Sequence, residues 1–153
     1  KPVPVNSHNL RDFRRDHMLI SAAGPGSNLL LGGTCLVLLF TLKSVSPDIE
    51  MIIYRLATTM HLPKEHLIMG PIVGFLFFGM IINLALALFN LIPIPPLDGH
   101  WILAGFLYGK ALEMLESLKP YGFIILYALL FFGALQWVFF PIYFLCRVYG
   151  WYL

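Results

Sequence analysis

The chain has 153 residues, of which 59% are hydrophobic and only 12% are charged. A soluble domain of this size must cover a large surface with polar groups, so this balance predicts a protein embedded in a lipid bilayer. The formal charge of +2 is small and scattered, and we therefore expect no nucleic acid partner. The chain begins with Lys1 and has no signal-peptide layout, so we expect an internal or C-terminal piece of a longer protein.

The first third of the chain predicts an extended segment, a membrane span and an amphipathic helix. Residues 1–5 combine proline with valine and are expected to be extended. Residues 18–42 contain no charge and are long enough to cross a bilayer. Ser46-Pro47-Asp48 predicts a capped helix start with proline at the first helical position, followed by an interfacial helix. Its apolar face comprises Ile49, Ile52, Ile53, Leu56, Ala57 and Met60, and its polar face Glu50, Tyr54, Arg55, Thr58 and Thr59.

Two further spans and one more helix are expected in the remainder. Residues 67–90 form the second span, and residues 121–146 the third, with a helix predicted over residues 99–119 between them. The predicted fold class is an all-α polytopic membrane protein with about three transmembrane helices, interfacial helices and a short extended N-terminal segment. We expect residues 1–153 to form one membrane-embedded domain.

Asp98 is the most informative residue, because it follows an uncharged run over residues 67–97 that has three prolines near its end. Proline cannot continue an α-helix, so the chain must unwind there and deliver a carboxylate at or near membrane depth. An acid in such a place is a candidate functional group, and a bound metal ion is a suitable partner for it. The alternative is structural, because aspartate is also among the best helix N-caps.

Other polar residues in the apolar segments also have two interpretations. Asn28 and Asn90 either join helices or serve chemistry. His61 and His66 stand in an H-x-x-x-E-H spacing, which differs from the metalloprotease motifs and predicts a polar loop. His100 either reaches a site near Asp98 or points to water at the helix start.

Two motifs resemble those of a known family. Asn90-Leu-Ile-Pro-Ile-Pro-Pro-Leu-Asp98-Gly99 is similar to the Asn-x-x-Pro-x-x-Pro-Leu-Asp-Gly signature of the site-2 protease family of intramembrane zinc metalloproteases. Ala23-Gly-Pro-Gly-Ser-Asn28 resembles the Ala-Gly-Pro-x-x-Asn that opens the preceding span in that family. The resemblance covers residues 1 to about 105, in the same order and spacing.

The resemblance implies a function and a set of roles. Asp98 would be a zinc ligand, and Asn28 and Asn90 would lie beside the active site and bind the substrate backbone or the developing oxyanion. The extended segment around residues 3–6 would offer a strand edge to an unwound substrate helix. The expected protein is a multi-pass enzyme of the cell membrane that cleaves the transmembrane segment of another membrane protein.

One family motif is missing from the chain. The His-Glu-x-x-His that supplies two zinc ligands and the general base is absent, and in the family it lies on the span before the segment that begins with Lys1. Truncation explains this absence better than loss. The alternatives are a transporter or channel whose broken span lines an ion path, and a catalytically dead scaffold.

Overall fold

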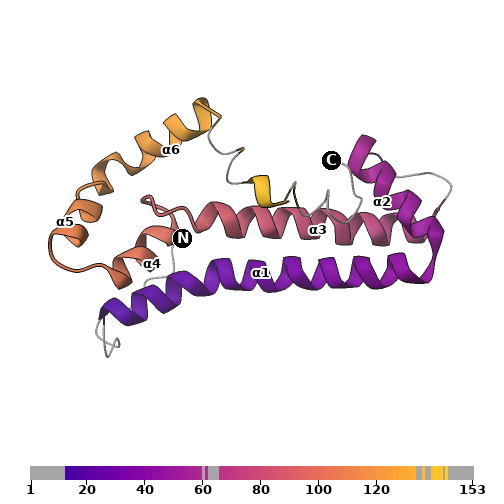
Figure 1. Ribbon diagram of the computed structural model, residues 1–153, viewed down its shortest axis with the longest axis horizontal. Helices are drawn as coiled ribbons and strands as arrows, with labels where there is room; N and C mark the ends of the chain where they lie inside the picture. The colour runs from indigo at the N-terminus through magenta and orange to yellow at the C-terminus, as the bar shows by residue number, and fades with distance from the viewer. Residues whose placement is uncertain are drawn as a thin grey trace. The chain divides into compact units, whose positions relative to one another are not determined.

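The computed structural model describes residues 13–59, 61, 66–133, 136, 139–142 and 144. Within these residues the chain is helical and contains no strand, which confirms the predicted all-α class. The helices belong to two compact units (Figure 1). Unit 1 holds the described residues of Lys1–Gly26 and Phe89–Gly133, and unit 2 those of Ser27–Leu88 and Ala134–Leu153. The extended segment expected over residues 1–5 lies outside the described residues.

Two long helices, α1 (Phe13–Val45) and α3 (Met69–Asn90), contribute to both units, and unit 2 contains α1 from Ser27 onward and α3 as far as Leu88. They lie side by side in Figure 1. A Cβ atom added to Gly32 would lie 2.9 Å from Leu84 Cγ, and one added to Gly79 would lie 3.3 Å from Cys35 Sγ. The numbers of the paired residues rise on α1 as they fall on α3, so the helices are antiparallel. Glycine at these contacts allows their backbones to approach closely, as is typical of helices packed in membranes.

The amphipathic helix α2 (Pro47–Thr59) confirms the predicted faces. Pro47 is its first residue, and five of the six predicted apolar positions are buried, while Met60 lies outside the described residues. All five predicted polar positions are exposed. The buried face joins a core whose other fully buried or nearly buried members are Leu39, Val73, Phe77, Met80 and Ile142. The 3.6-residue period of the sequence therefore identified a face that packs on α1 and α3.

Three described segments are long and apolar enough to cross a membrane, namely Arg14–Val45, Met69–Asn90 and Lys110–Phe131. The first two confirm the predicted spans. Most of their surface is exposed. Only 11% of the apolar stretch in Arg14–Val45 is buried, and only 33% of the apolar stretch in Met69–Asn90. Exposed apolar surface of this extent is expected of helices that contact lipid.

The helical segments of unit 1 are shorter than predicted. The helix expected over residues 99–119 is divided into α4 (Asp98–Phe106) and α5 (Lys110–Glu116), because Leu107 is extended and Gly109 has a positive φ of 54°. A short 3₁₀ helix, η2 (Lys119–Tyr121), then leads into α6 (Gly122–Phe131).

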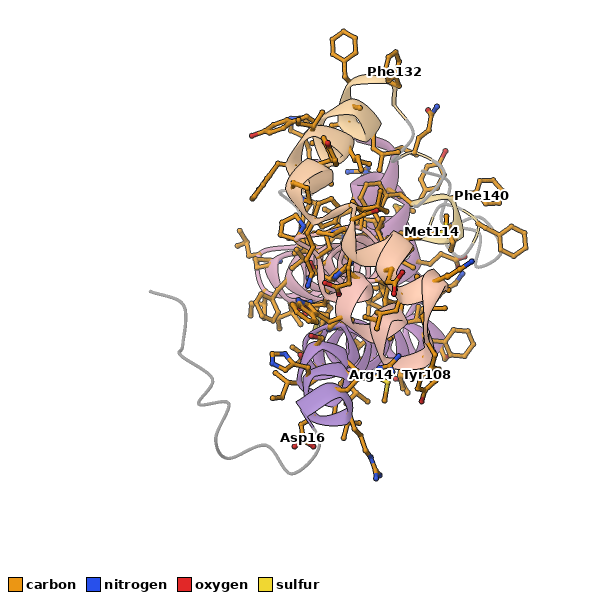
Figure 2. The ribbon with its side chains drawn as sticks, turned by 90° about the vertical axis from the view of Figure 1, so that its left-hand side faces the viewer. Arg14, Asp16, Tyr108, Met114, Phe132 and Phe140 are labelled. Carbon is orange, nitrogen blue, oxygen red and sulfur yellow. The ribbon has the colours of Figure 1, made fainter. Side chains whose placement is uncertain are left out.

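The third predicted span is also wrong in its bounds. Helix α6 ends at Phe131, and Gly133 follows with a φ of 68°, a left-handed conformation that ends helices. The third membrane-compatible segment therefore combines α5, η2 and α6 instead of beginning at Tyr121. Met114 on α5 and Phe132, directly after α6, are labelled in Figure 2 and are 72% and 81% exposed.

Candidate functional site

The candidate site is built on the turn over residues 91–97, which follows the last residue of α3, Asn90. The prolines end the helix as predicted, and local hydrogen bonds hold the turn instead. The Ile94 amide donates to Ile92 O over 2.8 Å, and the Leu97 amide donates to Ile94 O over 2.9 Å. The chain then enters α4 directly, with Asp98 as its first residue.

Two glycines pack against the backbone of this turn. A Cβ atom added to Gly99 would lie 2.5 Å from Ile92 O, and one added to Gly122 would lie 2.7 Å from the carbonyl carbon of Pro95. Neither distance leaves room for a side chain, so the first turn of α4 and the start of α6 both touch the main chain of the turn. These contacts between backbones therefore restrict where Asp98 can lie.

The Asp98 carboxylate lies against the backbone of α1. A Cβ atom added to Gly24 would lie 3.1 Å from Asp98 Oδ2. The N-cap of α4 is Leu97 and no side chain caps the helix, so the interpretation of Asp98 as the N-cap is wrong. The Asp98 side chain makes no hydrogen bond or ion pair with the residues that the structure describes. It is half-buried, and this desolvation raises the pKa of the carboxyl.

Helix α1 gives a measure of how deep this carboxylate lies. The last charged residue at the start of α1 is Asp16, and the uncharged run predicted as a span begins at Met18, six residues before Gly24. At the rise of an α-helix, six residues correspond to about 9 Å. Asp98, which contacts Gly24, therefore lies beside the apolar part of α1, where an unpaired carboxylate is unfavourable without a cation.

The two asparagines belong to different units. Asn90 lies in unit 1 with Asp98, and Asn28 lies in unit 2. Both side chains are half-buried, and neither amide hydrogen-bonds with a described residue. Asn83 differs from them, because its Nδ2 donates to Gly79 O over 2.8 Å within its own helix. The roles of Asn28 and Asn90 at an active site stay predictions.

His100 neither points to water nor shares a face with Asp98. It is 1% exposed, and its Nε2 lies 3.5 Å from Glu116 Oε1 without hydrogen-bond geometry. Burial lowers its pKa, an effect that the negative charge of Glu116 partly offsets. Helical residues two apart do not face each other, so His100 turns to α5 while Asp98 turns to α1.

Arg14 is a residue of this region that was not predicted from the sequence to belong to the site. Its Nε and Nη2 both donate to the carbonyl oxygen of Ala104, over 3.0 and 2.7 Å. Its guanidinium carbon lies 4.0 Å from the ring centroid of Tyr108 (Figure 2). Ala104 is 90 residues away in the chain, and no local pattern could have indicated this contact.

The described residues hold no group of three His, Cys, Asp or Glu side chains that could bind a metal ion. Asp98 fits one position of such a site, since a partly buried carboxylate without a partner is a suitable oxygen ligand for zinc. His61 is exposed, and its ring nitrogen contacts Thr59 O at 2.5 Å. The described part of the chain thus fits a single ligand of a metal site.

Comparison with known proteins shows the family of this chain. The model of the family described as Peptidase family M50 matches residues 8–133. "Putative zinc metalloprotease YwhC" of Bacillus subtilis (strain 168) is 30% identical over 128 residues, which make up 82% of this chain and 50% of that protein. The chain therefore spans half the length of this curated relative. No solved structure matches the chain significantly.

Proposed function

The chain belongs to peptidase family M50, the site-2 protease family, and we propose that it forms part of a zinc-dependent endopeptidase that cleaves within membranes. The observation that carries the proposal is the placement of Asp98, which is half-buried against Gly24 and makes no hydrogen bond or ion pair with the described residues. We propose that the substrate is the membrane-spanning segment of another protein. The enzyme would be a multi-pass protein of the cell membrane.

Asp98 would contribute one carboxylate oxygen to the zinc ion. When bound, zinc supplies Lewis-acid chemistry to the hydrolysis of a peptide bond. The remaining ligands and the general base would come from a His-Glu-x-x-His segment elsewhere in the protein. The close approaches at Gly24 and Gly99 restrict where the Asp98 carboxylate can lie.

Asn28 and Asn90 would act on the substrate. A substrate helix hides its carbonyl groups in hydrogen bonds, and cleavage requires that a short stretch unwinds. Each asparagine offers an amide that can donate to a substrate carbonyl and accept from a substrate N–H group. Such donors would also stabilise negative charge that develops on the carbonyl oxygen during attack. Neither amide is occupied by a described residue, which leaves both available for this role.

The proposal is tested by replacing Asp98 in the full-length protein. Asparagine and alanine are both much poorer zinc ligands than aspartate, so D98N and D98A should lose zinc and cleavage of a transmembrane substrate. Because Asp98 makes no capping bond, both variants should fold as well as wild type. The matched control is Asp48→Asn, which changes an exposed acid in the first turn of α2 and should leave zinc and activity unchanged.

Zinc content by mass spectrometry, cleavage rate and thermal unfolding are measured on the same preparations. A D98N protein that keeps full zinc and full activity would refute the assignment of Asp98. A folded wild-type protein that binds no zinc and cleaves nothing would instead identify a catalytically dead scaffold.

A further inference from the structure

Helix α4, which carries Asp98, has little internal support. It contains nine residues, and helices this short are marginal in isolation. No side chain caps its N-terminus, and the chain turns to an extended conformation at Leu107 directly after it. The last four carbonyl groups of any α-helix lack partners within the helix, and Ala104 provides one of these four here. The position of α4 must therefore be set by contacts with other elements.

Arg14 supplies such a contact at the C-terminal end of α4. Two of its N–H groups donate to Ala104 O, so one guanidinium satisfies a carbonyl that the helix itself leaves open. A positive charge at this end also interacts favourably with the helix dipole. The same guanidinium lies over the ring of Tyr108, which follows α4, and this contact fixes the plane of the group.

Helix α4 contacts α1 at three places along its length. Arg14 binds Ala104, a Cβ atom added to Gly105 would lie 2.8 Å from Met18 Cγ, and Gly24 lies against Asp98. The two helices are therefore antiparallel, with Arg14 at one end of their contact and Asp98 at the other. Ala104 follows Asp98 by six positions, which corresponds to about 9 Å of helix. A shift at the Ala104 end is expected to move Asp98, because both residues belong to the same short helix.

We propose that Arg14 is a positioning residue that holds α4 in register on α1 and thereby places the Asp98 carboxylate against Gly24. The link to catalysis rests on the proposed function, whereas the placement of α4 does not. The competing role for Arg14 is that of a general interfacial cation, because Lys and Arg are common at the ends of membrane spans. The two roles make different demands on the side chain. An interfacial cation needs only its charge, whereas the contact with Ala104 and Tyr108 needs the planar fork of arginine.

The first experiment measures the placement of α4 without reference to activity. Met18→Cys and Gly105→Cys are introduced together into the full-length protein, after its other cysteines have been replaced by alanine. The Cβ atoms at these two positions would be 2.9 Å apart, so a small relaxation reaches disulfide geometry. The rate of disulfide formation under mild oxidation then reports how α4 lies on α1. It is compared among proteins with wild-type Arg14, Arg14→Lys, Arg14→Gln and the control Lys110→Gln, which removes an exposed cation at the start of another membrane-compatible segment.

We expect Arg14→Gln to slow disulfide formation by about tenfold, which corresponds to the loss of one charge-assisted hydrogen bond. Arg14→Lys should restore the rate only in part, because an ammonium group cannot form the fork or stack flat on Tyr108. Lys110→Gln should match wild type. Equal rates for Arg14→Lys and wild type, or for Arg14→Gln and Lys110→Gln, would overturn the proposal in favour of a general interfacial cation.

The second experiment uses Arg14→Gln and the control Lys110→Gln in the full-length protein with its native cysteines. Arg14→Gln should weaken zinc retention against a chelator by about 10- to 100-fold, as expected when a supporting contact of a metal ligand is lost. It should lower kcat and leave KM unchanged, since Arg14 is not proposed to touch substrate. Unchanged zinc retention and kcat would overturn the positioning role. An inert wild-type protein whose disulfide rate still depends on Arg14 would overturn the proposed function and support the placement of α4.

Discussion

Replacement of Gly99 by alanine tests whether backbone contacts set the position of Asp98. The new Cβ atom would lie 2.5 Å from both Ile92 O and the carbonyl carbon of Leu91, whereas ordinary contacts begin at 3.4 Å. Either the turn or α4 must therefore move by about 1 Å, and neither can escape by rotating a side chain. Overpacking of this kind costs about 1–3 kcal/mol, and the higher helix propensity of alanine returns up to about 1 kcal/mol.

The expected effect on activity is much larger than this effect on stability. Asp98 is adjacent to the substituted residue, and a misplacement of about 1 Å at a catalytic group can lower the rate about 100-fold. Thermal unfolding in detergent and cleavage of a transmembrane substrate are measured on the same preparations of the full-length protein. The control is Gly26→Ala, whose Cβ atom would meet nothing within 4 Å and which should be neutral or stabilising by up to about 1 kcal/mol. Full activity in Gly99→Ala would refute the reasoning, as would a loss of activity that only follows the unfolded fraction.

Three further predictions concern the asparagines, the metal and the core. Asn28→Leu and Asn90→Leu should each lower turnover and leave zinc content and melting temperature unchanged, whereas a parallel fall in melting temperature would assign them to helix packing. Residues 1–153 alone should bind no zinc tightly, because their described part holds no group of three ligands, and stoichiometric zinc in the purified fragment would contradict the assignment of Asp98 as one ligand among several. Ile53→Ala should destabilise unit 2 by about 2–5 kcal/mol in chemical unfolding, whereas Thr58→Ala on the exposed face of the same helix should stay within about 0.5 kcal/mol of wild type.

Composition and periodicity were sufficient to predict the first two spans and the faces of α2, because these features depend on local hydrophobicity alone. They were insufficient for the helix ends in the second half of the chain. Gly26 and Gly33 lie inside α1, whereas Gly109 and Gly133 adopt positive φ angles where helical structure breaks or ends. The same residue type therefore continues a helix in one place and ends it in another. Tertiary contacts decide between these outcomes, and a single sequence does not record them.

In the candidate site, too, the sequence predicted features that depend on neighbouring residues and missed those that depend on contacts between distant residues. The proline-rich motif identified Asp98 and the turn before it, since proline ends a helix wherever it stands. The motif did not show that Leu97 is the N-cap, nor that Arg14 binds Ala104 across 90 residues. Burial of His100 was also missed, because its contact with Glu116 depends on the break between α4 and α5.

The glycines around Asp98 are required because a side chain at these positions would collide with its neighbours. None of them has a positive φ angle. At Gly99 and Gly122 the space beyond the Cα atom is filled by the main chain of the turn, and at Gly24 it is filled by the Asp98 carboxylate itself. A main chain cannot be repacked by a change of rotamer, so these contacts leave the carboxylate few alternative positions. In the proposed site, the reactive carboxylate of Asp98 thus depends for its placement on residues that are not themselves reactive, namely these glycines and, by the inference drawn above, Arg14.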